Sequence, residues 1–401
     1  MKTDWEIKRL PDVAKYFIGL TYTPKDVSNV GTIVLRSSNV QNDELDLSDL
    51  VRVTCSVNKL LYVCKGDILM CSRNGSKRLV GKTAVIGDLP EKMTFGTFMM
   101  VIRSEYNPYL SWFFRSEAFR EQIGVGENTM INQITKYMLD AIHVPTPPLP
   151  EQCRIVAILD QAFAGIATAK ANAEQNLKNA RALFESHLQS VFTERGEGWV
   201  SNKLGAITTK IGSGATPRGG EDSYKNEGIS LIRSLNVYDI KFKYKRLAFL
   251  DDIQASDLSN VEVKTNDVLL NITGASIARS CIVPDDVLPA RVNQHVSIIR
   301  PLPHILNSKF LSYLLVSKPY KNKLLQTGEE GGSTRQAITK AQISDFFVSY
   351  PELIKKQTEI VVKLDDMISR TQHLESIYQR KLAALDDLKK SLLNQAFSGQ
   401  L

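Results

Sequence analysis

The run Ile18-Gly19-Leu20-Thr21-Tyr22-Thr23-Pro24 returns near the middle of the chain as Ile211-Gly212-Ser213-Gly214-Ala215-Thr216-Pro217. Both copies begin with Ile-Gly and end with Thr-Pro, which gives a Gly-x-x-x-Thr-Pro pattern twice. Further blocks recur in the same order: residues 35–40 as 232–237, 66–70 as 266–270, 110–114 as 311–315, 134–136 as 338–340 and 152–160 as 357–365. Because chance does not keep so many short blocks collinear, the sequence predicts one structural unit written twice.

Each unit reads as a globular part followed by a long helix. The globular parts mix short β-type runs, such as Thr32–Leu35 and Ser297–Ile299, with Gly, Asn, Pro and Ser. Proline is absent from residues 151–195 and again after Pro351, which favours two long helices. We therefore predict an α+β chain with globular domains at 1–148 and 197–350 and helices at 149–196 and 351–401.

The two predicted helices carry complementary apolar seams with alternating steps of four and three residues. In the second helix the seam is Ile360, Leu364, Met367, Thr371, Leu374, Tyr378, Lys381, Leu385, Leu388 and Leu392. In the first helix it is Ile155, Leu159, Ala162, Ile166, Ala169, Ala173, Asn176, Ala180 and Leu183. A small seam facing a bulky one predicts an antiparallel coiled coil with approximate two-fold symmetry. The alternative is that each helix packs only on its own domain, but a helix of about 60 Å is longer than a small domain needs.

The bulk composition is that of a globular protein without a membrane segment. The 401 residues are 43% hydrophobic and 23% charged, and no apolar stretch approaches the length that crosses a bilayer. The N-terminus lacks the apolar run of a signal peptide, so we expect a cytoplasmic protein. The five cysteines are scattered without a C-x-x-C pair and are expected to be reduced. The net charge of +7 is compatible with a polyanionic partner but does not establish one.

Segments that resemble catalytic motifs are incomplete. Gly75 to Thr83 ends like a phosphate-binding loop in Gly81-Lys82-Thr83, but five residues instead of four separate Gly75 from Gly81. The second copy has Ala278-Arg279-Ser280 there, without the lysine. We therefore reject a nucleotide hydrolase.

Two other segments fail in the same way. Asn107-Pro108-Tyr109 lacks one proline of the Asn-Pro-Pro-Tyr signature of amino-methylating enzymes. Asp252 with Glu262-Val263-Lys264 could imitate a nuclease cluster, although a surface strand end is the better interpretation. We expect no catalytic, cofactor or metal site in this chain, although a triad assembled from distant positions is not visible in a sequence.

Polar residues follow the β-type runs in both copies, where loops would meet a partner. Arg, Asn and Gln pair bidentately with base edges, and Lys contacts phosphates. In the first half the candidate DNA-contacting residues are Arg36, Ser38, Asn39, Arg73, Asn74, Lys77, Arg78, Asn132 and Gln133. In the second half they are Thr216, Arg218, Arg233, Asn236, Lys243, Lys245, Arg335 and Gln336.

The run Lys241 to Arg246 alternates charge with aromatics, so on a strand it would form a basic ladder, although such runs are more often simply solvated. Two similar but different readers at the ends of a rigid spacer would read two different half-sites across an unread gap, whereas an identical pair would need a palindrome.

The sequence resembles the specificity subunits of type I restriction-modification systems over essentially its full length. The resemblance rests on the two Gly-x-x-x-Thr-Pro runs, on Pro148-Leu149-Pro150-Glu151-Gln152 and on the two closing helices. It implies two target-recognition domains that each read half of a bipartite site on double-stranded DNA. The helices would set the gap and dock two methyltransferase subunits. The second Pro-Leu-x-Glu-Gln run is replaced by residues 351–357, which puts the start of the second helix in doubt.

The resemblance also implies that the chain has no catalytic centre of its own. S-adenosylmethionine would belong to the methyltransferase subunits, and ATP and magnesium to partner subunits that include a restriction and translocation subunit. One alternative is the recognition part of a catalytic methyltransferase or nuclease, which a complete cofactor or carboxylate motif would reveal. Another is a scaffold that binds proteins, which an absence of salt-dependent duplex binding would favour.

Overall fold

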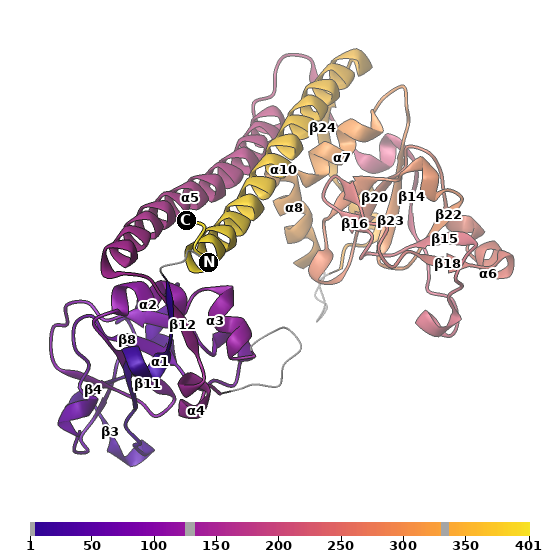
Figure 1. Cartoon of the computed structure of the whole chain (residues 1–401). Helices are drawn as coiled ribbons and strands as arrows, with labels where there is room; N and C mark the ends of the chain where they lie inside the picture. Colours follow the sequence, from indigo (N-terminus) through magenta and orange to yellow (C-terminus); the bar gives the residue numbers. More distant parts are fainter. Residues whose placement is uncertain (1–4, 125–132, 330–336) are drawn as a thin grey trace. The chain divides into compact units, whose positions relative to one another are not determined.

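The computed structural model describes residues 5–124, 133–329 and 337–401 and divides into two compact units (Figure 1). Unit 1 comprises Met1–Glu174 with Gln379–Leu401, and unit 2 comprises Gln175–Tyr378. Each unit therefore holds one globular domain, here domain 1 or domain 2, together with parts of both long helices. The fold is α+β, as predicted.

Domain 1 contains two four-stranded sheets. The first sheet is antiparallel, in the order β2 (Lys15–Ile18), β11 (Met99–Arg103), β8 (Ile68–Cys71) and β9 (Thr83–Val85). The second has the order β10 (Met93–Phe95), β4 (Thr32–Leu35), β7 (Val51–Val53) and β3 (Val27–Ser28), with β10 and β4 parallel.

The alternation of side chains explains why β8 is apolar at every position. Ile68 and Met70 belong to a core shared with the helices, whereas Leu69 and Cys71 belong to the core between the two sheets. A strand buried on both faces reads as a continuous apolar run, because successive side chains point to opposite faces. Domain 1 is thus layered as helices, first sheet and second sheet.

Domain 2 repeats this plan, as expected from the internal repeat. Its antiparallel sheet has the order β14 (Thr208–Ser213), β23 (Val296–Pro301), β20 (Val268–Asn271) and β21 (Ser280–Ile282). Its second sheet has the order β18 (Ala248–Leu250), β15 (Ile229–Ile232), β22 (Ala290–Val292) and β19 (Glu262–Val263), with β15 and β22 parallel. Leu269 faces the core between the sheets, while Val268 and Leu270 face the helices.

Short elements complete both domains. The two-stranded pairs are β1 (Glu6–Arg9) with β12 (His143–Thr146), β5 (Val40–Gln41) with β6 (Glu44–Leu45), β13 (Trp199–Lys203) with β24 (Phe347–Pro351) and β16 (Val237–Tyr238) with β17 (Lys241–Phe242). The short helices are α1 (Leu10–Val13), α2 (Asn107–Phe113), α3 (Glu117–Gln122), α4 (Lys136–Asp140), α6 (Asp252–Asp257), α7 (Ser308–Val316), α8 (Lys318–Glu329) and α9 (Lys340–Asp345). Single 3-10 turns, such as η2 (Ser37–Asn39) and η4 (Lys77–Leu79), lie between strands.

The long helices are α5 (Leu149–Thr193) and α10 (Ile354–Ser398), each of 45 residues. Gln152 donates through Nε2 to Pro147 O at 2.9 Å, and Gln357 donates to Pro351 O at 2.8 Å. The second helix therefore begins with the same glutamine contact as the first, even though the surrounding motif has changed.

The helices pack against each other with opposite chain direction. In unit 1 the first part of α5 lies beside the last part of α10, and Lys170 pairs with Asp386 at 2.6 Å (Figure 1). In unit 2 the last part of α5 lies beside the first part of α10, and Arg181 pairs with Glu375 at 2.7 Å. The predicted antiparallel coiled coil is confirmed.

Each helix also enters the core of a domain. Phe397 of α10 contacts Phe113 at a ring-centroid distance of 5.5 Å in domain 1, and Phe192 of α5 contacts Phe310 at 5.3 Å in domain 2. The start of α5 also packs in domain 1, through Ile155 and its neighbours. Packing on the domains, which the sequence offered as an alternative, therefore occurs together with the coiled coil.

The predicted seams are buried or partly buried at most of their positions and exposed at a few. Ile155, Leu159, Ile166, Ala173, Ala180 and Leu364 are buried, but Leu183, Leu374 and Leu388 are 66%, 39% and 45% exposed. Lys381 is exposed as well, while its neighbour Leu382 is partly buried. An ordinary helix drifts by about 20° per heptad against a strict seven-residue repeat, so the buried line moves to adjacent residues.

Among the residues that the structure describes, no helix combines the length and apolarity needed to span a membrane.

Candidate nucleic-acid interface

Loops from both sheets of domain 1 meet at one edge. Because β11 runs antiparallel to both β2 and β8, the ends of β2 and β8 lie next to the start of β11. The second sheet joins this edge through Leu20 N, which donates to Phe95 O at 2.7 Å, and Gly96 N, which donates to Leu35 O at 2.9 Å. We call this surface edge 1; it comprises residues 19–24, 36–39, 72–82, 96–98 and Gln133. Edge 2 is its counterpart in domain 2 and comprises residues 214–219, 233–236, 272–279 and 293–295.

A glycine begins the first loop of each edge because the backbone of the neighbouring strand is too close for a side chain. A Cβ on Gly19 would lie 2.1 Å from Gly96 O, and a Cβ on Gly214 would lie 1.8 Å from Val292 O. Contacts this short do not occur, so only glycine fits without displacing the backbone.

Strand pairing also corrects the alignment of the two loops. Lys15 lies opposite Arg103 and Lys210 lies opposite Arg300, which makes Gly19 equivalent to Gly214. The sequence repeat had matched Gly19 with Gly212, two residues away. The two Thr-Pro runs consequently stand at different distances from their strands.

Asn39 and Asn236, two predicted DNA contacts, are buried inside their domains with 0% exposure. Asn39 Oδ1 accepts from Arg36 N at 2.8 Å, and Asn236 Oδ1 accepts from Arg233 N at 3.0 Å. Their amide groups donate to backbone carbonyls, including Asp46 O at 2.9 Å from Asn39. Both residues hold the loop after a strand and do not present their amides to a partner.

The arginines of the same motif are held by acidic side chains. Arg36 Nη2 lies 2.7 Å from Asp49 Oδ2, and 35% of the Arg36 side chain is exposed. Arg233 is 12% exposed, pairs with Glu221 at 2.6 Å and lies over the Tyr224 ring at 5.1 Å. Arg36 is therefore the more accessible of the two.

A cluster at the centre of edge 1 combines a cation, an amide and an exposed aromatic ring. Arg73 donates through Nε to Gln133 Oε1 at 2.9 Å, and its guanidinium lies 5.7 Å from the centre of the Phe98 ring. Phe98 is 53% exposed. Asn74 Nδ2 donates to Ser37 Oγ at 3.1 Å. These predicted residues are brought together, and sequence reasoning missed Phe98 although it directly precedes a core strand.

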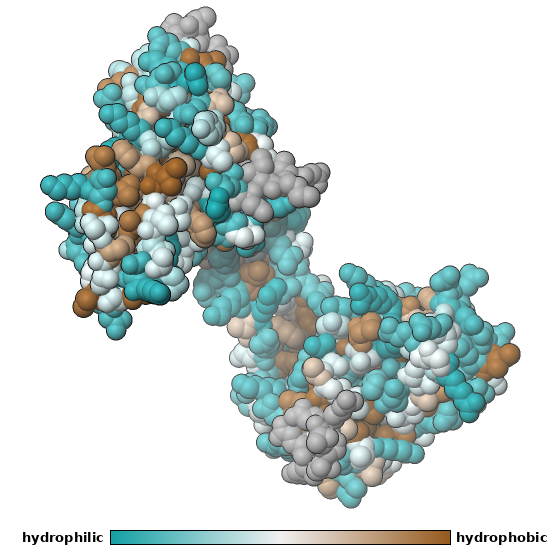
Figure 2. Space-filling model, turned by 90° about the horizontal axis from the view of Figure 1, so that it is seen from below, coloured by the Kyte–Doolittle hydropathy of each residue, from teal (hydrophilic) through white to brown (hydrophobic). Residues whose placement is uncertain are grey.

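The surface of unit 1 carries apolar as well as polar side chains. Figure 2 shows apolar surface gathered among hydrophilic residues on the lobe at the left, which is unit 1. Ile18, at the end of β2, is 55% exposed. Ser38 Oγ, by contrast, is buried without a hydrogen-bond partner among the described residues.

Lys82, the lysine of the apparent phosphate-binding loop, has a structural position. Its Nζ donates to Ser37 O and Val40 O, both at 2.6 Å. In domain 2 the amide of Asn271 takes over this contact and donates to Ser234 O at 2.9 Å. The ammonium group of Lys82 thus closes a neighbouring loop.

Edge 2 uses different side chains at the corresponding places. Thr216 Oγ1 donates to Gln294 Oε1 at 2.5 Å, and Thr273 Oγ1 lies 2.6 Å from His295 Nδ1. His295 is equivalent to Phe98 in domain 1. Ile272 N donates to the carbonyl of His295, just as Ser72 N donates to the carbonyl of Phe98. Gln294, Thr273 and His295 were not predicted; their position directly beside β20 and β23 was the available signal.

The basic ladder that residues 241–246 would form on a strand is not present. Strand β17 ends at Phe242, so Lys243 and Lys245 lie beyond it, and Arg246 turns the chain with a φ of 60°. Without a continuous strand the alternating charges do not share one face. Lys243 and Lys245 are nevertheless exposed, as is Arg218 in the first loop of edge 2.

Lys243 instead joins a cationic cluster around Tyr238. Its Nζ lies 3.6 Å from the centre of the Tyr238 ring, and the guanidinium of Arg279 lies 4.5 Å from that centre. The hydrogen bond from Lys243 is the main reason why the pKa of Tyr238 is below its usual value.

Lys77 and Arg78 lie in η4 and are exposed. Asn132, Arg335 and Gln336 lie outside the described residues. Within the described ranges, no group of three or more His, Cys, Asp or Glu side chains is arranged to hold a metal ion.

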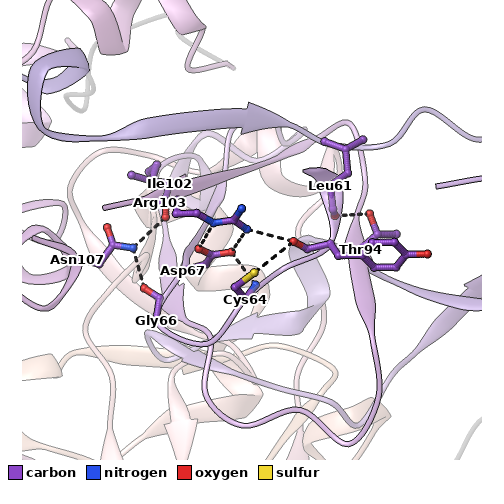
Figure 3. A network of polar contacts seen from close by, with 9 residues as sticks. Leu61, Cys64, Gly66, Asp67, Thr94, Ile102, Arg103 and Asn107 are labelled. Atoms are coloured by element: carbon purple, nitrogen blue, oxygen red, sulfur yellow. Dashed lines mark hydrogen bonds and ion pairs between the residues drawn. The ribbon is translucent and has the colours of Figure 1, made fainter. Parts of the chain in front are cut away.

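A polar network lies at the end of β8 and β11 that is opposite edge 1, and it holds the first sheet of domain 1 together (Figure 3). Asp67 accepts two hydrogen bonds from Arg103, and Asn107 Nδ2 donates to Gly66 O at 2.7 Å and to Ile102 O at 3.1 Å. Asn107 is 3% exposed. The Asn-Pro-Tyr run therefore begins a helix and anchors a loop.

Comparison with known proteins agrees with this architecture. The family model described as the type I restriction modification DNA specificity domain matches residues 2–179 and 196–382. The specificity subunit of the type I restriction enzyme EcoKI from Escherichia coli K12 is 25% identical, over 99% of this chain and 89% of that protein. The MjaVIII specificity subunit from Methanocaldococcus jannaschii is 22% identical, over 99% of this chain and 93% of that protein.

Solved structures share the fold over the whole chain. A chain from work on complex assembly and conformational transition of the type I R-M system has a TM-score of 0.78 at 20% identity, covering 100% of this chain and 99% of that chain. The HsdS subunit from Thermoanaerobacter tengcongensis has a TM-score of 0.64 at 19% identity, covering 100% and 98%. The internal repeat, the matched pair of sheet-rich domains and the family model together show that the chain belongs to the type I restriction-modification DNA specificity family.

Proposed function

We propose that the chain gives a type I restriction-modification complex its DNA sequence specificity by reading an asymmetric bipartite target. The observation that carries this proposal is that edges 1 and 2 share a strand arrangement and differ in side chains. Arg73, Gln133 and Phe98 stand at edge 1, whereas Gln294 and His295 stand at edge 2. Equivalent loops with different chemistry read two different half-sites.

The side chains of the edges suit base recognition in the major groove. Arg73 can offer paired donors to a guanine, and Gln133 or Gln294 can pair with an adenine. Their present contacts with neighbouring side chains hold them in place before DNA binds. Arg36, Asn74, Arg218, Lys243 and Lys245 are further proposed contacts, while the buried Asn39 and Asn236 support their loops.

The long helices fix the gap and bind the catalytic partners. Each helix exposes large apolar side chains, namely Leu149 and Leu183 on α5 and Val362 and Leu388 on α10. Exposed apolar surface on a rigid helix is suited to a protein partner. We assign it to two methyltransferase subunits, which supply S-adenosylmethionine and the methyl-transfer chemistry. A restriction and translocation subunit supplies ATP and magnesium chemistry, and the complex works in the cytoplasm.

The test is to map methylated adenines in DNA from cells that express the chain with its cognate methyltransferase. The expected result is a motif with two different specified parts separated by a fixed number of unspecified bases. Unmodified DNA from cells in which the complex is demonstrably assembled would contradict the proposal. A single continuous motif would contradict the assignment of one half-site to each domain.

A further inference from the structure

A basic groove lies in unit 1 between domain 1 and the end of α10. It has a volume of about 1090 Å³ and is bounded by the 77–83 segment, by residues of α3 and the turn before it, and by residues 386–394 of α10. The lining includes seven Lys or Arg side chains and four Asp or Glu side chains. All of these residues belong to the same unit.

The cations at the surface of this groove exceed the acids available to neutralise them. Asp386 is paired with Lys170 at 2.6 Å, so one of the four acids of the lining is already engaged with a cation outside it. Lys82 is also engaged, with its Nζ on backbone carbonyls. Arg78, Arg120 and Lys390 are exposed side chains of the lining. A groove with this surplus of positive charge attracts a polyanion.

The groove is continuous in sequence and structure with edge 1. The 72–82 segment carries Arg73 and Asn74 at the edge, and its η4 turn carries Arg78 into the groove lining. A duplex whose bases are read at edge 1 therefore has a basic surface beside it for its sugar-phosphate backbone. Lys389 is held in the wall by the Phe163 ring, with Nζ 5.5 Å from the ring centre.

The repeat shows that this basic wall is specific to unit 1. Phe192 and Phe397 occupy equivalent core positions in the two units, which fixes the correspondence between α5 and α10. By that correspondence, the positions of Lys389 and Lys390 on α10 are filled by Phe184 and Glu185 on α5. The helix that closes domain 2 thus offers an apolar and an acidic side chain where the helix that closes domain 1 offers two lysines.

We propose that this groove binds the DNA backbone beside the half-site read by domain 1, so that the two half-sites are held with unequal backbone contact. The proposal rests on the function proposed above. Lys389 and Lys390 supply the ammonium groups from the helix, and Arg78 and Arg120 supply guanidinium groups from the domain. Such contacts add affinity without reading bases.

The test compares K389Q/K390Q with K355Q/K363Q, which removes two exposed lysines from the opposite end of the same helix. Each variant is assembled with the cognate methyltransferase, and binding to a duplex with the mapped site is measured across salt concentrations. We expect K389Q/K390Q to weaken binding and to reduce the slope of log K against log salt by about two, since each lost phosphate contact removes about 0.9. We expect K355Q/K363Q to keep the wild-type slope.

Ethylation interference then locates the contacts. K389Q/K390Q should lose interference at phosphates flanking one half-site only, while the methylated motif stays unchanged. An unchanged salt slope and interference pattern would overturn the groove proposal, as would a loss of methyltransferase binding, which would assign the groove to a protein partner. A wild-type complex that methylates no bipartite motif would instead overturn the proposed function.

Discussion

Arg103 donates two hydrogen bonds to Asp67, from Nε to Oδ1 at 2.8 Å and from Nη2 to Oδ2 at 2.6 Å (Figure 3). Arg300 and Asp267 make the same pair in domain 2, with both distances at 2.7 Å. The two aspartates are 2% and 0% exposed on their side chains. The pair therefore ties β8 to β11, and β20 to β23, at the end of the sheet opposite the proposed DNA contacts.

Replacing Asp67 by Asn should destabilise domain 1, because it leaves the Arg103 guanidinium without its charged acceptor. The hydrogen bonding of Arg103 to the Asp67 carboxylate is the main reason why the pKa of Arg103 is raised, so the arginine stays charged. About a third of the Arg103 side chain is exposed. We therefore expect the free energy of unfolding to fall by about 2 kcal/mol, which is less than the cost of breaking a fully buried ion pair.

Chemical denaturation of the full chain measures the effect of Asp67→Asn. The matched control is Asp88→Asn, because Asp88 pairs with Lys65 at 2.8 Å and its side chain is 85% exposed. The control should change stability by less than about 0.5 kcal/mol. Equal effects of the two substitutions would show that the duplicated ion pair does not stabilise the sheet.

Adding a methyl group at Gly19 should disrupt edge 1. The new Cβ would lie 2.1 Å from Gly96 O, so the first loop has to move away from the neighbouring strand. Gly19→Ala should lower the free energy of unfolding by about 1–3 kcal/mol and weaken recognition of one half-site. Gly75→Ala is the control, since a Cβ at Gly75 meets no atom within 4 Å. Methylation-motif mapping that finds both half-sites intact in Gly19→Ala would contradict this prediction.

The order of the repeated blocks could be predicted from the sequence, but the residue-by-residue alignment of the loops in the two domains could not. Strands and helices recur because both domains need the same packed layers, whereas loops accept insertions at little cost. Aligning the residue types of the first loop pairs Gly19 with Gly212. Only the strand pairing of Lys15 and of Lys210 identifies Gly214 as the residue equivalent to Gly19.

The candidate contacts divide in a similar way. A polar residue after a strand can reach a partner or close its own loop, and the sequence does not show which carbonyls will face it. Arg73 and Gln133 came together at an exposed edge, whereas Asn39 turned inward to backbone groups. The helix seams failed at Leu183 because the heptad pattern ignores the slow rotation of the buried face along a straight helix.

Removing the Phe397 ring should destabilise domain 1, although the residue lies at the far end of the chain. The ring contacts Tyr109 at a centroid distance of 5.3 Å as well as Phe113, and it is 4% exposed. Phe397→Ala should cost about 3–5 kcal/mol. Leu388→Ala, at a position that is 45% exposed on the same helix, should cost much less. Hydrogen exchange should show the loss of protection in domain 1; a loss confined to domain 2 would be inconsistent with this packing.

Arg73→Ala should relax recognition in one half-site. If Arg73 pairs with a base, the substitution should reduce the discrimination between bases at one position of the DNA site by about 1–3 kcal/mol. Binding to duplexes that are already altered at that position should change least. Competition binding with duplexes altered base by base measures this. Arg233→Ala is a useful comparison, because Arg233 is pinned by Glu221 and should act through stability. A loss for Arg73→Ala that is the same for every sequence would assign Arg73 to phosphate contact.

Lengthening both long helices should change the gap between the half-sites without changing the half-sites themselves. The insertion belongs between the two interhelical ion pairs, after Glu174 in α5 and after Tyr378 in α10, so that Lys170 and Asp386 keep each other as partners. Seven residues add about 10 Å of helix, close to the length of three base pairs at about 3.4 Å each. Seven residues are also close to two full turns, so the packed faces of the helices stay aligned.

The spacing of the methylated motif provides the measurement for this variant. Inserting seven residues in only one helix is the control, because it breaks the interhelical register and should abolish modification. A correctly folded and active double insertion that keeps the wild-type gap would show that the helices do not set the distance. The gap would then have to be fixed by the partner subunits, since the domains themselves are unchanged.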